Sequence, residues 1–222
     1  MKWPATACTR AGQWPVQLRF KTALTSEQYV SRQAWRGATL ERCPLHPRGG
    51  CSFARHGTYE RLNPRGARIP RWYCPQAHRT FSLLADCFAA RLPGSLVELE
   101  AVVAEVEQAK SLEAAADRLR SDDIGLPAAI RWTRRRVKQV HALLTTLIGL
   151  LPELFAGCLP TVSAFRLRLD AEHCLPRLRE IAARYLSALA PPLGFAPPSR
   201  GNGEHQKRNQ QPTGPDPPSV NR

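Results

Sequence analysis

Hydrophobic and polar residues alternate along the first part of the chain. Residues 16–22 read Val-Gln-Leu-Arg-Phe-Lys-Thr, and this period of two predicts a half-buried strand. Thr25 and Gln28 are three positions apart, in the arrangement of a capping box, so we expect a helix to follow the strand. Two more strands are predicted near residues 53–62 and 69–73, joined by a turn with the sequence Asn-Pro-Arg-Gly.

After residue 94 the pattern changes to a helical period. A first helix is predicted to begin at Ser95 with an apolar face and an acidic outer face made by Glu98, Glu100, Glu105 and Glu107. A short second helix is expected after Ser111, and a third is expected to begin near Pro127, because the fixed φ of proline suits a first helical turn. Two later helices are predicted, one around Phe165 and one from about Pro176.

The third predicted helix has two distinct stripes. Its basic stripe, at positions i, i+3, i+4 and i+7, consists of Arg131, Arg134, Arg135 and Lys138. Its apolar seam, with alternating spacings of three and four, consists of Val137, Val140, Leu144, Leu147 and Leu151. The seam fits either an intramolecular core or a homodimer contact, and the basic stripe fits either a DNA contact or a solvated surface.

Three helices with a short middle member and a basic last member outline a helix-turn-helix unit, whose last helix enters the major groove. Trp132, early in this helix, is expected to pack in the small core rather than stack on a base. A plain three-helix interaction domain would have a similar pattern.

The overall prediction is an α+β fold, mainly α, in four segments. Residues 1–40 are expected to form an N-terminal strand and helix, and residues 41–92 a zinc-ribbon-like module. A helical domain is expected over residues 93–190, with the helix-turn-helix-like unit at 95–151. Residues 191–222 are rich in Pro, Gly, Asn, Gln and Ser and are expected to form a disordered tail.

Charge narrows the class of partner. The 222 residues include 32 Lys and Arg against 18 Asp and Glu, for a net charge of +14, which favours a polyanion such as DNA. The excess of arginine would also follow from a GC-rich genome without selection for binding. An odd number of cysteines, seven, and the absence of an apolar leader after Met1 favour a reducing compartment. The apolar run at residues 142–151 is too short to span a bilayer.

Two Cys/His clusters suggest a metal site. The first contains Cys43, His46 and Cys51, and the second contains Cys74 and His78. Clusters about twenty residues apart suit a tetrahedral zinc ion, because each turn supplies two ligands and the hairpin between them brings the turns together. Five residues compete for four positions. We predict Cys43, Cys51, Cys74 and His78 as ligands, with His46 as the alternative imidazole; buried thiols and loop histidines without metal are the competing interpretation.

These motifs resemble those of a known family. Cys43-Pro44 through Cys51, the run Arg55-His56-Gly57-Thr58-Tyr59, and Cys74-Pro75 through His78-Arg79-Thr80-Phe81 resemble the zinc ribbon at the front of bacterial insertion-sequence transposases and their helper proteins. The first knuckle is expanded relative to that family, and His78 is one position later than the usual cysteine. The resemblance covers roughly residues 40–140.

The resemblance implies a structural zinc ion at Cys43, Cys51, Cys74 and His78, and binding of mobile-element DNA ends through the helices. It also implies a location in the bacterial cytoplasm at the nucleoid. Full transposases continue into a catalytic domain with three metal-binding carboxylates on strands and helices, and this chain shows only helical patterns after residue 90. We therefore expect a DNA-binding protein that has no catalytic activity by itself. The alternatives are a zinc-stabilised protein interaction module and, with less support, a hydrolytic metalloenzyme.

Overall fold

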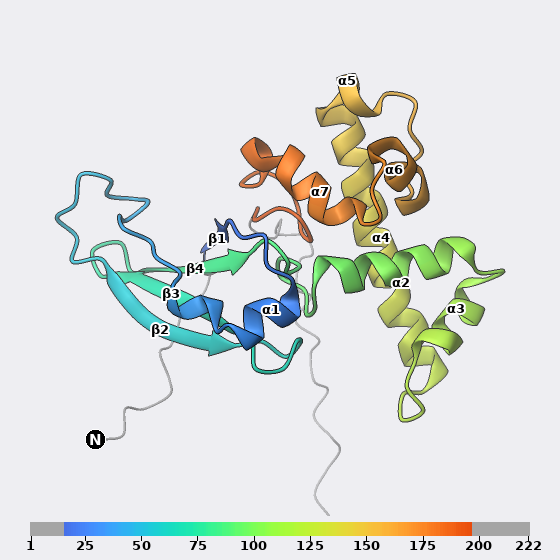
Figure 1. The fold of residues 1–222 in the computed structure, drawn as a ribbon, viewed down its shortest axis with the longest axis horizontal. Coiled ribbons are helices and arrows are strands. Elements are labelled where there is room, and N and C mark those ends of the chain that lie inside the picture. Colours follow the sequence, from blue (N-terminus) through green and yellow to red (C-terminus); the bar gives the residue numbers. More distant parts are fainter. Residues whose placement is uncertain (1–15, 197–222) are drawn as a thin grey trace, which may run out of the picture.

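The computed structural model describes residues 16–196 and has an α+β architecture, as predicted: a four-stranded sheet lies beside a group of helices (Figure 1). Residues 1–15 and 197–222 lie outside the described part, including most of the segment predicted to be a disordered tail. In the described residues, no helix has both the length and the apolar character needed to cross a membrane.

The sheet has the strand order β1-β4-β3-β2. Strands β2 (Ala54–Glu60), β3 (Arg68–Cys74) and β4 (Arg79–Ala85) form an antiparallel meander. Strand β1 (Val16–Phe20) then pairs parallel to β4, with Val16 opposite Phe81. The strand of the predicted N-terminal segment is therefore part of the same sheet as β2, β3 and β4. Strand β4 is not among the strands that the sequence predicted.

A short helix follows β1. Helix α1 (Ser26–Ser31) begins with the predicted capping box between Thr25 and Gln28, and a 3-10 turn, η1 (Ala34–Arg36), comes next. Arg55 of β2 donates to the carbonyls of Trp35 and Arg36 at 2.6 and 3.1 Å. These bonds hold η1 against the sheet.

The segment at residues 86–94 joins the sheet to the helices, and two arginines hold it. Arg61 donates through Nη2 to the carbonyls of Ala89, Leu92 and Gly94. Arg179, fully buried, donates to the carbonyls of Asp86 and Phe88 and to that of Pro192. Because buried carbonyls need donors, these guanidinium groups keep a segment without regular structure tightly packed.

The first three helices after the sheet begin where the sequence predicted. Helix α2 (Leu96–Gln108) has a capping box between Ser95 and Glu98, and Ser111 caps α3 (Leu112–Leu119). Helix α4 (Leu126–Leu150) has its proline in the first turn, and the remaining helices are α5 (Pro152–Phe155), α6 (Val162–Leu169), α7 (Cys174–Ile181) and the 3-10 turn η2 (Ala183–Tyr185). The short helix α5 was not predicted.

Two carboxylates predicted on the outer face of α2 have different positions. Glu100 is fully buried and accepts hydrogen bonds from the backbone N–H groups of Cys174 and Leu175 and from Nε of Arg166. Glu107 accepts from the backbone N–H groups of Val162 and Ser163. These residues bind the first turns of α7 and α6, where unpaired N–H groups and the helix dipole favour a negative charge.

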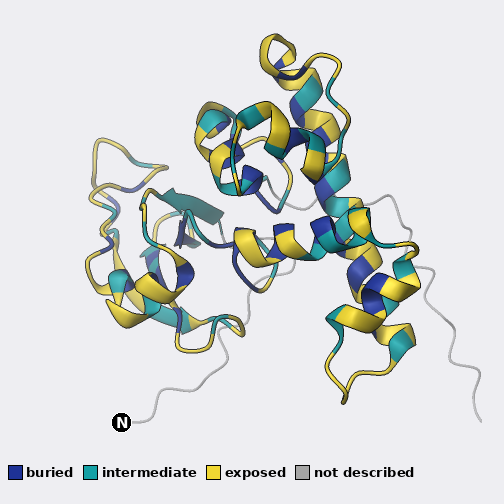
Figure 2. Ribbon diagram, turned by 45° about the vertical axis from the view of Figure 1, so that its right-hand side comes forward, coloured by how far each residue is buried: buried dark blue, intermediate teal, exposed yellow. Residues whose placement is uncertain are grey.

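The apolar seam of α4 is part of the chain's own core. Val140, Leu144, Leu147 and Leu151 are at most 3% exposed, and Val137 packs against the same cluster. The seam is therefore not available to a second copy, and the proposed homodimer contact through it is withdrawn in favour of the intramolecular alternative. The alternation of buried and exposed positions around α4 is visible in Figure 2.

The expected tail begins later than the sequence suggested. Leu193 and Phe195 are buried in the main core, and the N–H of Ala90 donates to the carbonyl of Pro192 at 2.8 Å. Residues 191–196 are thus part of the folded unit, because they cover the segment that joins the sheet to the helices.

Candidate metal centre and nucleic-acid interface

Four side chains from two distant segments lie close together. One segment is the loop before β2, which lies at the end of the sheet away from the helices (Figure 1), and the other is the C-terminal end of β3. The four residues are Cys43, His46, Cys51 and Cys74, and their ligand atoms all lie within 4.8 Å of one another. Nδ1 of His46 is 3.5 Å from Sγ of Cys43 and 3.4 Å from Sγ of Cys74. Ligands around a tetrahedral zinc ion are about 3.3–3.8 Å apart, given bond lengths of about 2.0–2.3 Å, so this group could hold a metal ion after small adjustments.

Local backbone structure brings these ligands together. His46 N–H donates to the carbonyl of Cys43 at 3.1 Å, which closes a tight turn with both side chains on one side. Gly49 and Gly50 have φ values of +87° and +84°, a region that favours glycine, and they turn the chain back toward Cys51. Cys74 is the last residue of β3.

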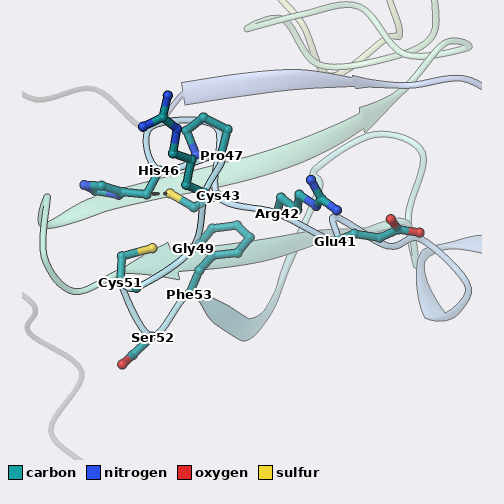
Figure 3. A pocket seen from close by; sticks show the side chains of 11 residues that line it. Glu41, Arg42, Cys43, His46, Pro47, Gly49, Cys51, Ser52 and Phe53 are labelled. Atoms are coloured by element: carbon teal, nitrogen blue, oxygen red, sulfur yellow. Dashed lines mark hydrogen bonds between the residues drawn. The ribbon is translucent and has the colours of Figure 1, made fainter.

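The cluster rests on a small apolar core of its own. Cys43, Cys51 and Cys74 are buried together with Trp72 and Phe81. An open hollow of about 440 Å³ lies beside the cluster, lined by residues 41–43 and 46–53 (Figure 3). In Figure 3 the sulfur atoms of Cys43 and Cys51 point into the same space, and the side chains of Glu41 and Arg42 extend away from it.

The environment treats the thiols differently. Burial opposes ionisation of Cys43, but hydrogen bonds from His46, from the backbone N–H groups of Leu45 and His46, and from Cys74 lower its pKa to about 7. Burial, together with hydrogen bonds between its thiol and the thiols of Cys43 and Cys74, raises the pKa of Cys51 to about 11. Metal ions bind the thiolate form of cysteine, so a bound metal ion would favour deprotonation of all three thiols.

His78, predicted as the fourth ligand, lies outside this group, and His46 takes the position. Nδ1 of His78 is 3.1 Å from the hydroxyl of Tyr73. Successive residues of a strand point to opposite faces, so this contact places His78 on the face opposite to the Cys74 side chain. The two-residue spacing between Cys43 and His46 was the sequence signal that favoured the alternative.

All four residues of the predicted basic stripe are exposed on the first half of α4. They are Arg131, Arg134, Arg135 and Lys138. Helix α4 contains no acidic residue, and among the described residues these four side chains form no ion pair. Their charge is therefore available to an external anion.

Trp132 was predicted to pack in the small core, and this prediction is wrong. The ring is 41% exposed, and the guanidinium of Arg136 lies 3.7 Å from its centre. Arg136, and not Trp132, is buried on this part of α4, since only 8% of Arg136 is exposed. Trp132 borders the basic stripe, since a helix turns about 100° per residue.

The positive charge of the described chain is unevenly divided. Residues 16–94, the sheet and its flanking segments, have 13 Lys and Arg against four Asp and Glu, for a net charge of +9. Residues 95–196 have 13 against 12, for a net charge of +1. The basic character of the sheet segment is visible in the sequence, which has seven arginines over residues 48–79: Arg48, Arg55, Arg61, Arg65, Arg68, Arg71 and Arg79.

Comparisons with protein-family models, with curated proteins and with solved structures found no match to this chain. The proposed function therefore rests on the Cys/His cluster and on the basic stripe of α4.

Proposed function

We propose that this chain is a zinc-stabilised DNA-binding protein, related to the N-terminal modules of insertion-sequence transposases and without catalytic activity by itself. The observation that carries the proposal is the exposed, unpaired basic stripe on α4, a helix without acidic residues. An aligned row of cations on one helix matches the phosphate charge and groove geometry of duplex DNA.

The donor set supports zinc as the metal. Three cysteines and one histidine are a common ligand set of structural zinc sites, and thiolates exclude the harder ions Mg²⁺ and Ca²⁺. Four protein ligands fill the tetrahedron and leave no position for substrate or water. The centre is therefore assigned a structural role.

The helical arrangement supports the proposed DNA contact. Helices α2, α3 and α4 pack on one another, and residues 120–125 separate the short α3 from the basic first half of α4. Arg131 and Arg134, nearest the helix start, are assigned to base edges. Arg135 and Lys138 are assigned to phosphates.

The test is a titration of labelled duplex DNA at two salt concentrations. Replacing all four stripe residues with Ala should weaken binding by about 100-fold or more, since one good bidentate base contact alone contributes about 1–3 kcal/mol. Replacing only Arg135 and Lys138 should weaken all sequences alike and reduce the salt slope by about one unit per lost contact.

A matched control removes the same charge elsewhere on the helical module. Lys110, Arg168, Arg177 and Arg184 are exposed and lie off the stripe, and their replacement with Ala should cost little affinity. Equal losses in the two quadruple variants would favour general charge attraction. Full DNA binding by the folded stripe variant would refute the helix-turn-helix proposal and favour the protein interaction module.

A further inference from the structure

The sheet has a second face whose side chains the metal centre does not use. In β3, Arg71 and Tyr73 alternate with Trp72 and Cys74, so they point away from the metal side. Ser82 lies opposite Arg71, and Thr80 lies opposite Tyr73. We call the group formed by His56, Arg71, Tyr73 and His78 the Tyr73 face.

Aromatic groups gather on this face. The rings of His56 and Tyr73 lie 5.6 Å apart with an interplanar angle of 40°, and the Tyr73 hydroxyl is 3.1 Å from Nδ1 of His78. His56 and His78 are exposed, and Tyr73 is partly exposed. Exposed aromatic surface on a sheet is suited to stacking on a planar ligand, which has a flat apolar surface on each side.

A guanidinium lies beside these rings without an acidic partner. Arg71 stacks over Tyr59 with 5.7 Å between the guanidinium carbon and the ring centre. Its Nε is shielded from solvent and has no hydrogen-bond partner among the described residues. The side chain as a whole is partly exposed, and Arg71 forms no ion pair among the described residues, so its guanidinium is available to an acceptor-rich anion.

Charge complementarity selects the ligand. Strands β2, β3 and β4 contain one acidic residue, Glu60. It pairs with Arg68 at 2.8 Å on the opposite face, because Arg68 is an odd number of positions from Arg71. The Tyr73 face is thus basic and aromatic, within a module of net charge +9.

We propose that the Tyr73 face binds single-stranded nucleic acid, with an unpaired base stacked on Tyr73 and His56 and a phosphate on Arg71. A duplex keeps its base faces inside the stack, whereas a single strand exposes them to aromatic side chains. This interface goes beyond the proposed duplex contact of α4 and lies on a different module, so each can be lost without the other.

The test uses the full chain and a fluorescent thymidine oligonucleotide of about 12 nucleotides, within the site sizes of sheet-based single-strand binders. Tyr73→Ser and Arg71→Gln should each weaken binding by about tenfold, and Tyr73→Phe, which keeps the ring, should bind like the wild type. Arg65→Gln removes the same charge from the exposed β2–β3 turn and should have a much smaller effect than Arg71→Gln.

Tyr73 is partly buried, so its replacement could also disturb the fold. A second variant avoids this difficulty. His56 is exposed, so His56→Ala should preserve the fold and weaken binding severalfold. Ultraviolet crosslinking to an oligonucleotide with 5-iodouracil should label the tryptic peptides 56–61 and 72–79. Metal content and circular dichroism confirm that each variant is folded.

The outcomes separate this inference from the proposed function. Single-strand binding that survives in the α4 stripe variant and is lost in the Tyr73-face variants, with duplex binding retained, supports it. Unchanged single-strand affinity in Tyr73→Ser, Arg71→Gln and His56→Ala, or crosslinks confined to other peptides, would overturn it. Loss of single-strand binding in the α4 stripe variant alone would overturn it too, and would leave the duplex contact of α4 in place.

Discussion

The end of the sheet around the metal cluster and the helical module differ in the size of their apolar cores and in the use of their charged residues. Around the metal cluster the apolar core is small, with Trp72, Phe81 and Leu83 as its main members beside the cysteines. The main core is larger and joins the helices to the other part of the sheet, through residues such as Ile69 and Leu84. In the helical module the buried Glu100 and the partly buried Glu107 hold the first turns of α7 and α6. The sheet module has a net charge of +9. The helical module has a net charge of +1, and two of its acidic residues, Glu100 and Glu107, accept hydrogen bonds from helix N–H groups.

This difference shows where each module is vulnerable. The end of the sheet around the metal cluster, which has few core residues, depends on a cross-link such as a metal ion. A helical module with ample apolar contacts depends instead on whether its buried charges keep their partners. Perturbing each kind of contact should therefore damage one module more than the other.

The largest effect is expected from metal removal. Zinc binding contributes about 10–16 kcal/mol of apparent free energy in small zinc modules, so chelation or Cys74→Ser should unfold the end of the sheet. Hydrogen exchange should then show loss of protection in β2 and β3, with α2 and α4 still protected. Metal analysis of the wild type should find about one zinc per chain, and full protection of metal-free protein would contradict the structural role.

The second effect concerns Glu100. Glu100→Ala should lower the free energy of unfolding by about 3 kcal/mol or more, because it leaves the Arg166 side chain and two helix N–H groups without their carboxylate. Urea denaturation measures the change. Glu105→Ala is the matched control on the same helix: its ion pair with Arg118 is largely exposed, and its loss should cost under about 1 kcal/mol.

Glu107 offers a pH-dependent version of the same comparison. Burial opposes its ionisation, but hydrogen bonds from Ser163, Val162 and His141 outweigh this and lower its pKa below the ordinary 4.5. A carboxyl with a lowered pKa in the folded state contributes stability that is complete above about pH 4.5 and is lost as the pH falls through the folded-state pKa. Glu107→Gln should remove this part of the acid dependence and cost about 1–2 kcal/mol at neutral pH, and denaturation series from pH 3 to 7 would measure both. An unchanged slope below pH 4.5 would contradict the assignment.

The local signals in the sequence located most elements but not their partners. Capping residues such as Thr25, Ser95 and Ser111 begin helices in the structure as predicted, because caps depend on neighbours within one turn. The pairing of β1 with β4 depends on residues about 65 positions apart along the chain. No local pattern encodes that distance.

The two carboxylates that bind the first turns of α6 and α7 show the same limit. The period of α2 assigned Glu100 and Glu107 to the outer face, since charged residues are rarely buried. Their partners on α6 and α7 make burial favourable, and those partners become visible only when the helices pack. Trp132 shows the reverse case: an aromatic residue expected inside stays exposed while Arg136 turns inward.

The candidate metal site was also predicted only in part: its cysteines were predicted, and its histidine was given only as the alternative. Spacing alone identified all three cysteines that the structure brings together, because a knuckle is local and its thiols are conspicuous. The choice between His46 and His78 could not be made from spacing, since it depends on which face of the sheet each turn presents. The two histidines differ by the side of the strand on which they lie.

The smallest predicted effect comes from that difference. His78→Gln removes only the contact with the Tyr73 hydroxyl, so zinc content should remain at about one per chain and stability should change by under about 1 kcal/mol. His46→Gln removes a ligand atom that lies 3.4 Å from Sγ of Cys74, and metal affinity should fall by 10-fold or more, as expected when a ligand of this kind is lost. A competition assay with a zinc-sensitive dye measures both variants against the wild type. If the His78 variant lost zinc and the His46 variant kept it, the ligand set would be the one that spacing first suggested, and the β3–β4 turn would have to be rotated when metal is bound.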